Sequence, residues 1–271
     1  MIKLIQAEKL RRILVSVFYA AAAAVLIYLA ADAQTVEGRA RYLCLLVLFP
    51  FGIYYEILRY LYARANELIY TACDAEGCLR LAEKAEKADF THQFRIQICY
   101  LKGFALLDLN RSGEAEQVLE QEAGTELTTK RKLDFEYNYL MFQLAAVRND
   151  RKELKAYYEK ICRIFNLGRR MNNGVKSLEA VIRGTYLTLT RQYQQAEKAF
   201  DIVRIQDLKR REQAYYCYYL SACEYALGKK KQAEKTYEKA CATAPGLPYI
   251  TGVDPCGSQP DAGEKKYRNG K

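Results

Sequence analysis

Cysteine and histidine are the residues of this chain that could bind a metal or supply a nucleophile. The 271-residue sequence contains nine cysteines and a single histidine, His92. The cysteines are odd in number, are scattered, and form no CxxC pair, so they match no zinc or redox motif. A partial site from Cys73, Cys78 and His92 has no motif to support it. We therefore predict no metal and interpret the thiols as small buried residues in a reducing compartment.

Motifs for other chemistry are also missing from the sequence. It contains neither GxSxG nor a phosphate-binding loop, because Gly168, Gly174 and Gly184 are too dispersed to hold a phosphate. His92 has no convincing nucleophile to pair with and precedes a predicted helix, where an exposed or capping role is expected. We predict that the protein is not an enzyme and uses no cofactor.

Two apolar runs near the N-terminus predict membrane-spanning helices. Residues 13–31 are uncharged and apolar over about the 20 residues that a span requires. The second run, about 42–62, contains Glu56, which we expect near the inner interface, paired with Arg59 among several tyrosines. An ion or proton site at Glu56 is the alternative, but it has no second acidic partner. Pro50 and Gly52 are expected to kink this helix.

The distribution of basic residues predicts the orientation. Lysines and arginines are dense before the first run and after the second, whereas the connection has only Arg39 and Arg41. Positive charge stays inside, so both termini and the following domain are predicted on the cytoplasmic side of the cell membrane. Ala31-Asp32-Ala33 resembles a signal-peptidase site, and cleavage is the alternative. Even then the second span would return the chain to the inside.

From residue 65 onward, apolar residues recur at helical spacing and turn residues divide them. This predicts an all-α domain with no strand. The predicted helices lie near 65–72, 74–88, 91–109, 112–123, 126–148, 150–166, 173–190, 192–206, 210–227 and 229–243.

Small and large residues recur within this domain in a similar order. The last unit has Leu220, Gly228, Ala233, Tyr237, Ala240 and Pro245; earlier units have Gly184, Leu187, Ala196 and Phe200, and Gly103, Leu106, Ala115 and Leu119. This pattern resembles a degenerate tetratricopeptide repeat, with other helical-pair solenoids as the rival. The small positions Ala115, Leu154, Ala196 and Ala233 are separated by about 39, 42 and 37 residues, against about 34 in that family.

The apolar runs, the resemblance and the composition of the C-terminal segment together predict an all-α architecture in three parts. These are a two-helix transmembrane hairpin (1–64), a tetratricopeptide-like helical solenoid (65–245) and a disordered tail (246–271). Residues 74–85 resemble the second helix of a preceding half-repeat, with Cys78, Ala82 and Ala85 in small positions. Its partner, 59–72, directly continues the second span. A continuous rod and a break near Asn66 are both open.

In the tetratricopeptide family the first helix of each unit lines a groove that takes peptides or partner helices. The resemblance places these residues in that groove: Gln97, Tyr100, Phe104, Asp108, Glu136, Tyr139, Gln143, Thr185, Thr188, Tyr215, Tyr218 and Tyr225. Ordinary packing is the alternative for each tyrosine, since 23 are present. The lysine and asparagine clamp for acidic chaperone tails is missing from these positions.

Basic residues outnumber acidic ones, 42 to 32. They cluster at Lys130-Arg131-Lys132, Arg169-Arg170, Lys209-Arg210-Arg211 and Lys229-Lys230-Lys231, the first three in turns on one predicted edge. Solvated helix ends and contact with anionic lipid are the two main interpretations, and nucleic acid is not expected. We predict a membrane-anchored cytoplasmic adaptor that binds a protein or peptide in its groove. The alternatives are a peptide-sensing regulator whose solenoid signals to the hairpin, and a subunit of a transport complex.

Overall fold

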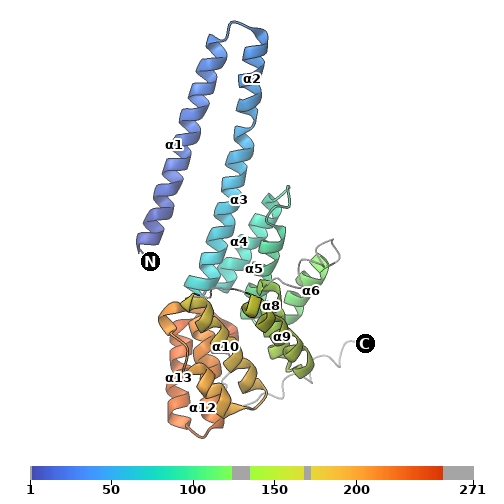
Figure 1. Ribbon diagram of the computed structural model, residues 1–271, viewed down its shortest axis with the longest axis vertical. Helices are drawn as coiled ribbons and strands as arrows, with labels where there is room; N and C mark the ends of the chain where they lie inside the picture. Colours follow the sequence, from blue (N-terminus) through green and yellow to red (C-terminus); the bar gives the residue numbers. More distant parts are fainter. Residues whose placement is uncertain (1, 124–134, 168–171, 253–271) are drawn as a thin grey trace. The chain divides into compact units, whose positions relative to one another are not determined.

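The computed structural model describes residues 2–123, 135–167 and 172–252, and every regular element in these ranges is a helix (Figure 1). The prediction of an all-α protein is therefore confirmed. The chain divides into two compact units, Met1–Tyr60, called unit 1, and Leu61–Lys271, called unit 2.

Unit 1 contains α1 (Ile2–Asp32), α2 (Val36–Val47) and the first part of α3 (Phe49–Glu67). The helices α1 and α2 pack against each other, as Figure 1 shows. The hydroxyl of Thr35 accepts a hydrogen bond from the Gly38 N–H at 3.2 Å and so caps the start of α2. The guanidinium of Arg39 donates to the Ala33 carbonyl at 2.8 Å, which satisfies a backbone group just after α1. Local bonds thus define the turn between the two helices.

A break separates α2 from α3 close to Pro50, where a kink was predicted. Pro50 is the second residue of α3 and has no N–H to donate to the preceding turn, so the regular ladder ends at Val47. Gly52 has a different role from the predicted kink. A Cβ at Gly52 would lie 2.6 Å from the hydroxyl oxygen of Tyr19, whose ring also stands edge-on to Phe49 at 5.7 Å. Gly52 therefore allows α1 to approach α3 closely.

Among the described residues, one helical run is long and apolar enough to cross a membrane, Val36–Ala72, which includes the α2–α3 break. The apolar stretch of α1 that is described with its side chains, Val17–Asp32, is shorter. The predicted first span starts at residue 13, outside those side chains. The two-span hairpin therefore stays a prediction. Glu56 and Arg59 lie 3.8 Å apart, as the interfacial ion pair requires.

The helix α3 continues without interruption to Glu67 and is followed by the π-helical turn η1 (Leu68–Ala72). The helical run therefore continues past Asn66, where a break was the alternative, but its α-helical geometry ends at Glu67. The first left-handed residue of this segment is Cys73, with φ of 56°.

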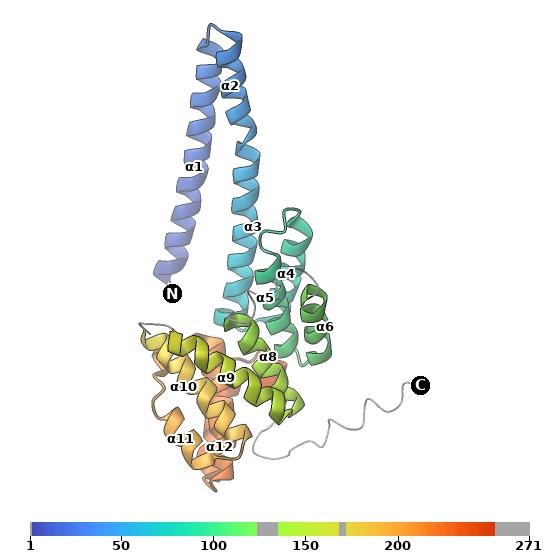
Figure 2. The ribbon, with the colours of Figure 1, turned by 45° about the vertical axis from the view of Figure 1, so that its right-hand side comes forward.

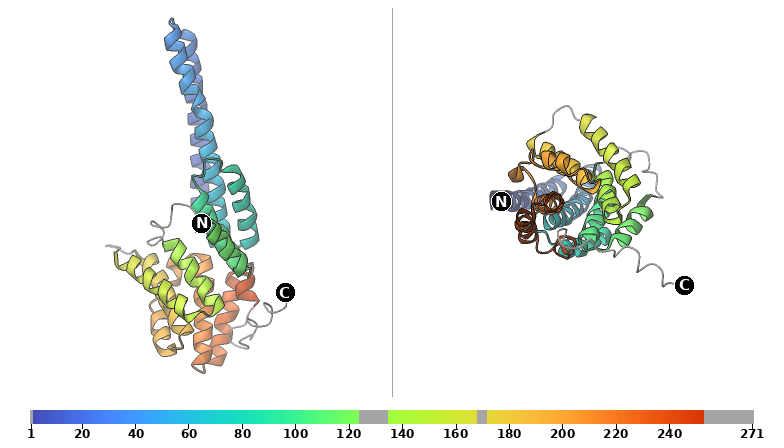
Figure 3. Two further views of the ribbon diagram at one scale, coloured as in Figure 1. Left: turned by 90° about the vertical axis from the view of Figure 1, so that its right-hand side faces the viewer. Right: turned by 90° about the horizontal axis from the view of Figure 1, so that it is seen from below.

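The remaining helices of unit 2 pack mostly as sequential pairs (Figures 2 and 3). They are α4 (Ala75–Ala88), α5 (Arg95–Asp108), α6 (Ser112–Ala123), α8 (Phe135–Arg148), α9 (Arg151–Leu167), α10 (Asn173–Leu189), α11 (Tyr193–Phe200), the 3-10 turn η2 (Ile205–Asp207), α12 (Arg210–Ala226), α13 (Lys230–Thr243) and α14 (Pro248–Thr251). The start of the predicted helix 126–148 lies outside the described residues.

One turn geometry joins the helices in four of these pairs. A single residue adopts a left-handed conformation after α5, α8, α10 and α12, with φ between 55° and 81°: Asn110, Asn149, Arg191 and Gly228. The N–H of the next residue then donates to a carbonyl in the last helical turn at 2.8–3.0 Å. This closure of the helix end is characteristic of the Schellman motif. The four pairs are therefore folded back by the same backbone device.

The predicted small positions follow these turns at a constant distance along the chain. Ala115, Leu154, Ala196 and Ala233 are all buried, and so is Cys78 after the left-handed residue Cys73. Two predicted glycines also allow close packing. A Cβ at Gly103 would lie 2.5 Å from a Leu140 methyl, and one at Gly184 would lie 2.4 Å from the Phe200 ring. Membership of the tetratricopeptide class stays a prediction.

Two local predictions are wrong. The helix predicted over 192–206 ends at Phe200, because β-branched residues follow and the Ser177 hydroxyl accepts the Arg204 N–H at 3.2 Å. The predicted disordered tail begins too early, since Leu247, Tyr249 and Ile250 are buried and α14 packs on α5, α12 and α13. Gly246 lies against the Cys73 carbonyl, where a Cβ would come within 2.5 Å. Residues 253–271 lie outside the described ranges.

Candidate binding site

A buried ion pair joins the first and last helical pairs of unit 2. Asp108 ends α5 and Arg211 lies in the first turn of α12, and both side chains are wholly buried. The guanidinium donates twice to the carboxylate, at 2.7 and 2.8 Å, and once to the Gln143 carbonyl oxygen of α8 at 3.0 Å. The Tyr215 hydroxyl donates to the same carboxylate at 2.6 Å. Residues more than 100 positions apart are thereby held together.

Aromatic rings enclose this ion pair. The guanidinium carbon of Arg211 lies 4.9 Å from the centre of the Phe104 ring and 4.6 Å from that of Tyr215. Burial alone would lower the pKa of Arg211, but the carboxylate of Asp108 outweighs that effect and raises the pKa well above its ordinary value. The arginine is therefore charged at every physiological pH and held by a planar, bidentate partner.

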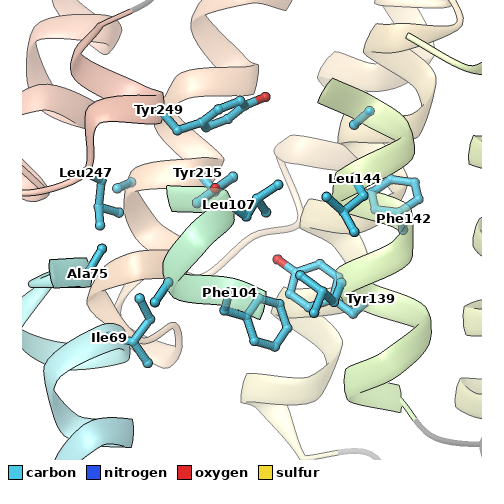
Figure 4. Close-up of a cluster of buried hydrophobic side chains, with 14 of the residues drawn as sticks. Ile69, Ala75, Phe104, Leu107, Tyr139, Phe142, Leu144, Tyr215, Leu247 and Tyr249 are labelled. Atoms are coloured by element: carbon cyan, nitrogen blue, oxygen red, sulfur yellow. The ribbon is translucent and has the colours of Figure 1, made fainter. Parts of the chain in front are cut away.

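A cavity of about 240 Å³ lies in unit 2 beside the aromatic side of this cluster. Its walls include the rings of Tyr70, Phe104, Phe135 and Tyr139. Phe135 stacks on Tyr139 with centroids 5.5 Å apart, and Phe104 contacts Tyr139 at 6.0 Å. Figure 4 shows Phe104 and Tyr139 beside each other, on neighbouring α5 and α8. The other lining residues are Glu136, Asn172, Gly174, Val175, Leu178, Asp207, Lys209 and Glu212.

Charged residues also line the cavity. The ammonium nitrogen of Lys209 lies 4.0 Å from the centre of the Tyr70 ring. Glu212 is buried and accepts the Lys209 N–H at 2.8 Å, which satisfies a backbone donor at the start of α12. Burial raises the pKa of Glu212 from its ordinary value. In the part of the chain that the structure describes, the buried Oδ2 of Asp207 has no hydrogen-bond partner.

Most of the predicted groove residues lie in the interior. Nine of the twelve are buried: Tyr100, Phe104, Asp108, Tyr139, Gln143, Thr185, Thr188, Tyr215 and Tyr218. Gln97, Glu136 and Tyr225 are exposed. The reason is that α12 packs on α10, α11, α13 and η1, so it fills the space that an open groove would leave. Phe104, Glu136 and Tyr139 line the cavity. That any of the twelve contacts a partner stays a prediction.

Four tyrosines of α12 are buried although they are distributed around more than one side of the helix. They are Tyr215, Tyr216, Tyr218 and Tyr219. Tyr249 of α14 explains part of this, because it stacks on Tyr215 at 5.6 Å and its hydroxyl lies 3.0 Å from that of Tyr219. Figure 4 shows Tyr249 alongside Tyr215.

The predicted basic edge is interrupted at its third cluster. Arg211 belongs to the buried ion pair, and Arg210 donates to the Thr243 carbonyl at 2.6 Å. Lys229 of the fourth cluster pairs with Glu197 at 2.5 Å. The clusters at 130–132 and 169–170 lie outside the described residues. Among the residues of the third cluster, Lys209 is therefore the cation that lines the cavity.

Nine of the twelve lining residues were not predicted for the groove, among them Tyr70, Phe135, Asp207, Lys209 and Glu212. None occupies a groove position of the resembled family, so their meeting follows only from the packing of α12 on η1 and α10. His92 is exposed in a turn before α5, whereas Cys73 and Cys78 are buried. In the described ranges no three histidine, cysteine or acidic side chains are grouped so that they could hold a metal ion.

Comparisons of the chain with models of protein families, with curated proteins and with solved structures found no match.

Proposed function

We propose that this chain is a membrane-anchored helical adaptor, in which unit 1 spans the membrane and unit 2 binds a segment of a partner protein. The observation that carries the proposal is a contrast in burial. Unit 1 exposes many large apolar side chains, whereas unit 2 buries most of its own. In unit 1, α2 has no buried residue, and Val17, Phe18, Leu45 and Phe51 are among many large apolar side chains that stay exposed. A water-soluble hairpin would leave this surface uncovered, whereas lipid would cover it.

The anchor is proposed to consist of two helices, with both termini and unit 2 on the cytoplasmic side of the cell membrane. The apolar run of α2 and α3 supports one span, and the packing of α1 along α2 supports its return partner. Tyr19 against Gly52 and Phe49 adds a close, small-residue contact of the kind that membrane helices use.

The repeat character of unit 2 is part of the proposal. Four pairs closed by the same turn, each followed by a buried small or leucine residue, support a degenerate tetratricopeptide-like solenoid. Unlike an open solenoid, its ends are joined by Asp108, Arg211 and α14. We therefore propose that the partner uses the cavity lined by Phe104, Glu136 and Tyr139 rather than a long groove.

The regulator is the second candidate, and one observation favours it. The helix α3 runs unbroken from Phe49 to Glu67 and so contains residues of both units. A stiff helix transmits a change in either unit more directly than a flexible linker does. In this version, ligand binding in unit 2 changes the membrane segment.

Photocrosslinking from the exposed cavity residue tests the adaptor proposal. A photoreactive amino acid at Glu136 is compared with one at Lys155, which is exposed on α9. Capture of one discrete protein from membranes by the probe at 136, and not by the probe at 155, would support the proposal. Equal capture from both positions, or recovery of the chain in the soluble fraction, would contradict it.

A further inference from the structure

We propose that the cavity of unit 2 binds a cationic group, namely the ammonium or guanidinium of a lysine or arginine side chain in a basic peptide segment. This deepens the proposed function and rests on it for the statement that the ligand belongs to a protein. The argument uses the size of the cavity, its aromatic walls, its charge and one unpaired carboxylate oxygen.

The size of the cavity suits one side chain. Sites for drug-sized ligands measure about 300–1,000 Å³, and this cavity, at about 240 Å³, lies just below that range. A partner helix or a folded domain would not enter it. A single long side chain, inserted from a peptide that lies across the opening, fits the available volume.

The walls suit a cation. Aromatic faces attract positive charge through the ring quadrupole, within about 6 Å of the centroid. The structure already contains an example, because the Lys209 ammonium lies 4.0 Å from the Tyr70 centroid at the cavity wall. Phe104 likewise faces the Arg211 guanidinium at 4.9 Å. Two of the four lining rings therefore already engage a cation of the chain itself.

The charge of the lining favours the same ligand. Among the lining residues that the structure describes, three carry a carboxylate, Glu136, Asp207 and Glu212, and one carries an ammonium, Lys209. Within the described residues, Asp207 Oδ2 is buried and accepts no hydrogen bond. A buried acceptor without a donor is costly, and an ammonium or guanidinium would supply the missing donor. An anionic ligand would instead add to the excess of negative charge.

The test measures binding of small probes to the full chain in lipid nanodiscs by isothermal titration calorimetry. The probes are N-acetyl-lysine methylamide and its neutral analogue N-acetyl-norleucine methylamide, which differ in the terminal ammonium. We expect the lysine probe to bind at least about 10-fold more tightly, a difference of about 1.4 kcal/mol. Equal affinities, or tighter binding of the norleucine probe, would overturn the inference.

Three variants sharpen the test. Asp207→Asn removes the unpaired carboxylate, and we expect the lysine probe to bind about 10-fold more weakly. Glu238→Gln makes the same charge change on the exposed face of α13 and should leave affinity unchanged. Lys209→Gln removes the competing ammonium and should strengthen binding several-fold. Weaker binding of the lysine probe after Lys209→Gln would contradict the inference, because removal of a like charge should not cost a cationic ligand affinity.

Butylamine, which carries the ammonium but no peptide backbone, distinguishes a free amine ligand from a peptide ligand. If butylamine binds more weakly than N-acetyl-lysine methylamide, the result supports a peptide ligand. Equal or tighter binding of butylamine overturns that part of the inference. The proposed function is scored separately by the crosslink from position 136. If a partner is captured and the lysine probe does not compete, the adaptor stands and the cation site fails. If the probe binds and no partner is captured, the site stands and the adaptor fails.

Discussion

The two units of this chain place polar and apolar side chains in opposite ways. In unit 1 many of the large apolar residues of α1 and α2 whose side chains are described are exposed, and α2 buries none of its side chains. In unit 2 a charged pair, Asp108 and Arg211, lies wholly inside, surrounded by tyrosine and phenylalanine. An exposed apolar surface is favourable only where lipid or a partner protein covers it, and a buried charge only where a partner neutralises it. The stability of each unit therefore depends on what surrounds these side chains.

The largest effect is expected from removing the segment that closes unit 2. Deletion of residues 246–271 exposes the core that Leu247, Tyr249 and Ile250 cover. Each side chain contributes about 1.5–3 kcal/mol on burial, so a loss of about 5 kcal/mol is expected. Hydrogen exchange of the α12 amides, compared between the truncated and the full membrane-bound chain, measures this loss of stability. Deletion of residues 253–271 is the control; equal protection in both truncations would show that α14 does not stabilise unit 2.

A smaller effect is expected from unpairing the buried charge. Asp108→Asn leaves the Arg211 guanidinium without its carboxylate, and breaking a buried pair in this way costs about 3–5 kcal/mol. The control, Glu114→Gln, breaks the exposed pair with Arg111 and should cost less than about 1 kcal/mol. Thermal unfolding followed by circular dichroism compares the two. Similar decreases in unfolding temperature for the two variants would mean that the buried pair contributes no more to stability than the exposed pair.

Charge placed in unit 1 tests the other side of the comparison. Leu45→Arg puts a charge on an exposed position of α2, which would be harmless in water. In a bilayer an arginine costs up to about 2.5–3.5 kcal/mol, the value at the centre of a span, so we expect a reduced membrane-integrated fraction after alkaline extraction. Val36→Arg, at the start of α2, should have little effect because it lies near the expected interface. An unchanged fraction for Leu45→Arg would argue against the second span.

The smallest effect concerns the pH dependence of unit 2. Burial raises the pKa of Glu212 from its ordinary value of 4.5, so the folded state holds this proton more tightly than the unfolded state. This contribution to stability is present at low pH and is lost as pH rises through the folded-state pKa. Glu212→Gln should therefore flatten the fall in unfolding temperature above pH 4.5 relative to the parent chain. A steeper fall in the variant would reverse the sign of this argument.

The sequence was sufficient to predict features that depend on local patterns. Most of the helices, the buried small residues Ala115, Ala196 and Ala233, and a disturbance of the second apolar helix at Pro50 follow from helical periodicity, side-chain volume or a missing N–H. Asn110 and Asn149 lie between predicted helices and adopt positive φ, which asparagine tolerates. These signals lie within a few residues of the feature that they predict.

Features that depend on distant residues were not predictable in this way. Nothing in the sequence near Arg211 indicates that its partner is Asp108, since any basic triplet in a turn is normally solvated. Without that pair, α12 could not be placed in the interior, and the groove residues Tyr100, Tyr215 and Tyr218 were expected to be accessible. The short segment after Pro245 has the composition of a tail, but three of its apolar residues complete the core.

The buried tyrosines also give the molecule an optical property. The chain has no tryptophan, so its 23 tyrosines dominate its near-ultraviolet absorption. Burial raises the pKa of Tyr215 and Tyr219 well above the ordinary value, so their phenol groups stay protonated while unit 2 is folded. In an alkaline titration these phenols would ionise together when the helices separate. The absorbance of tyrosinate would then serve as a built-in signal of unfolding that needs no attached dye.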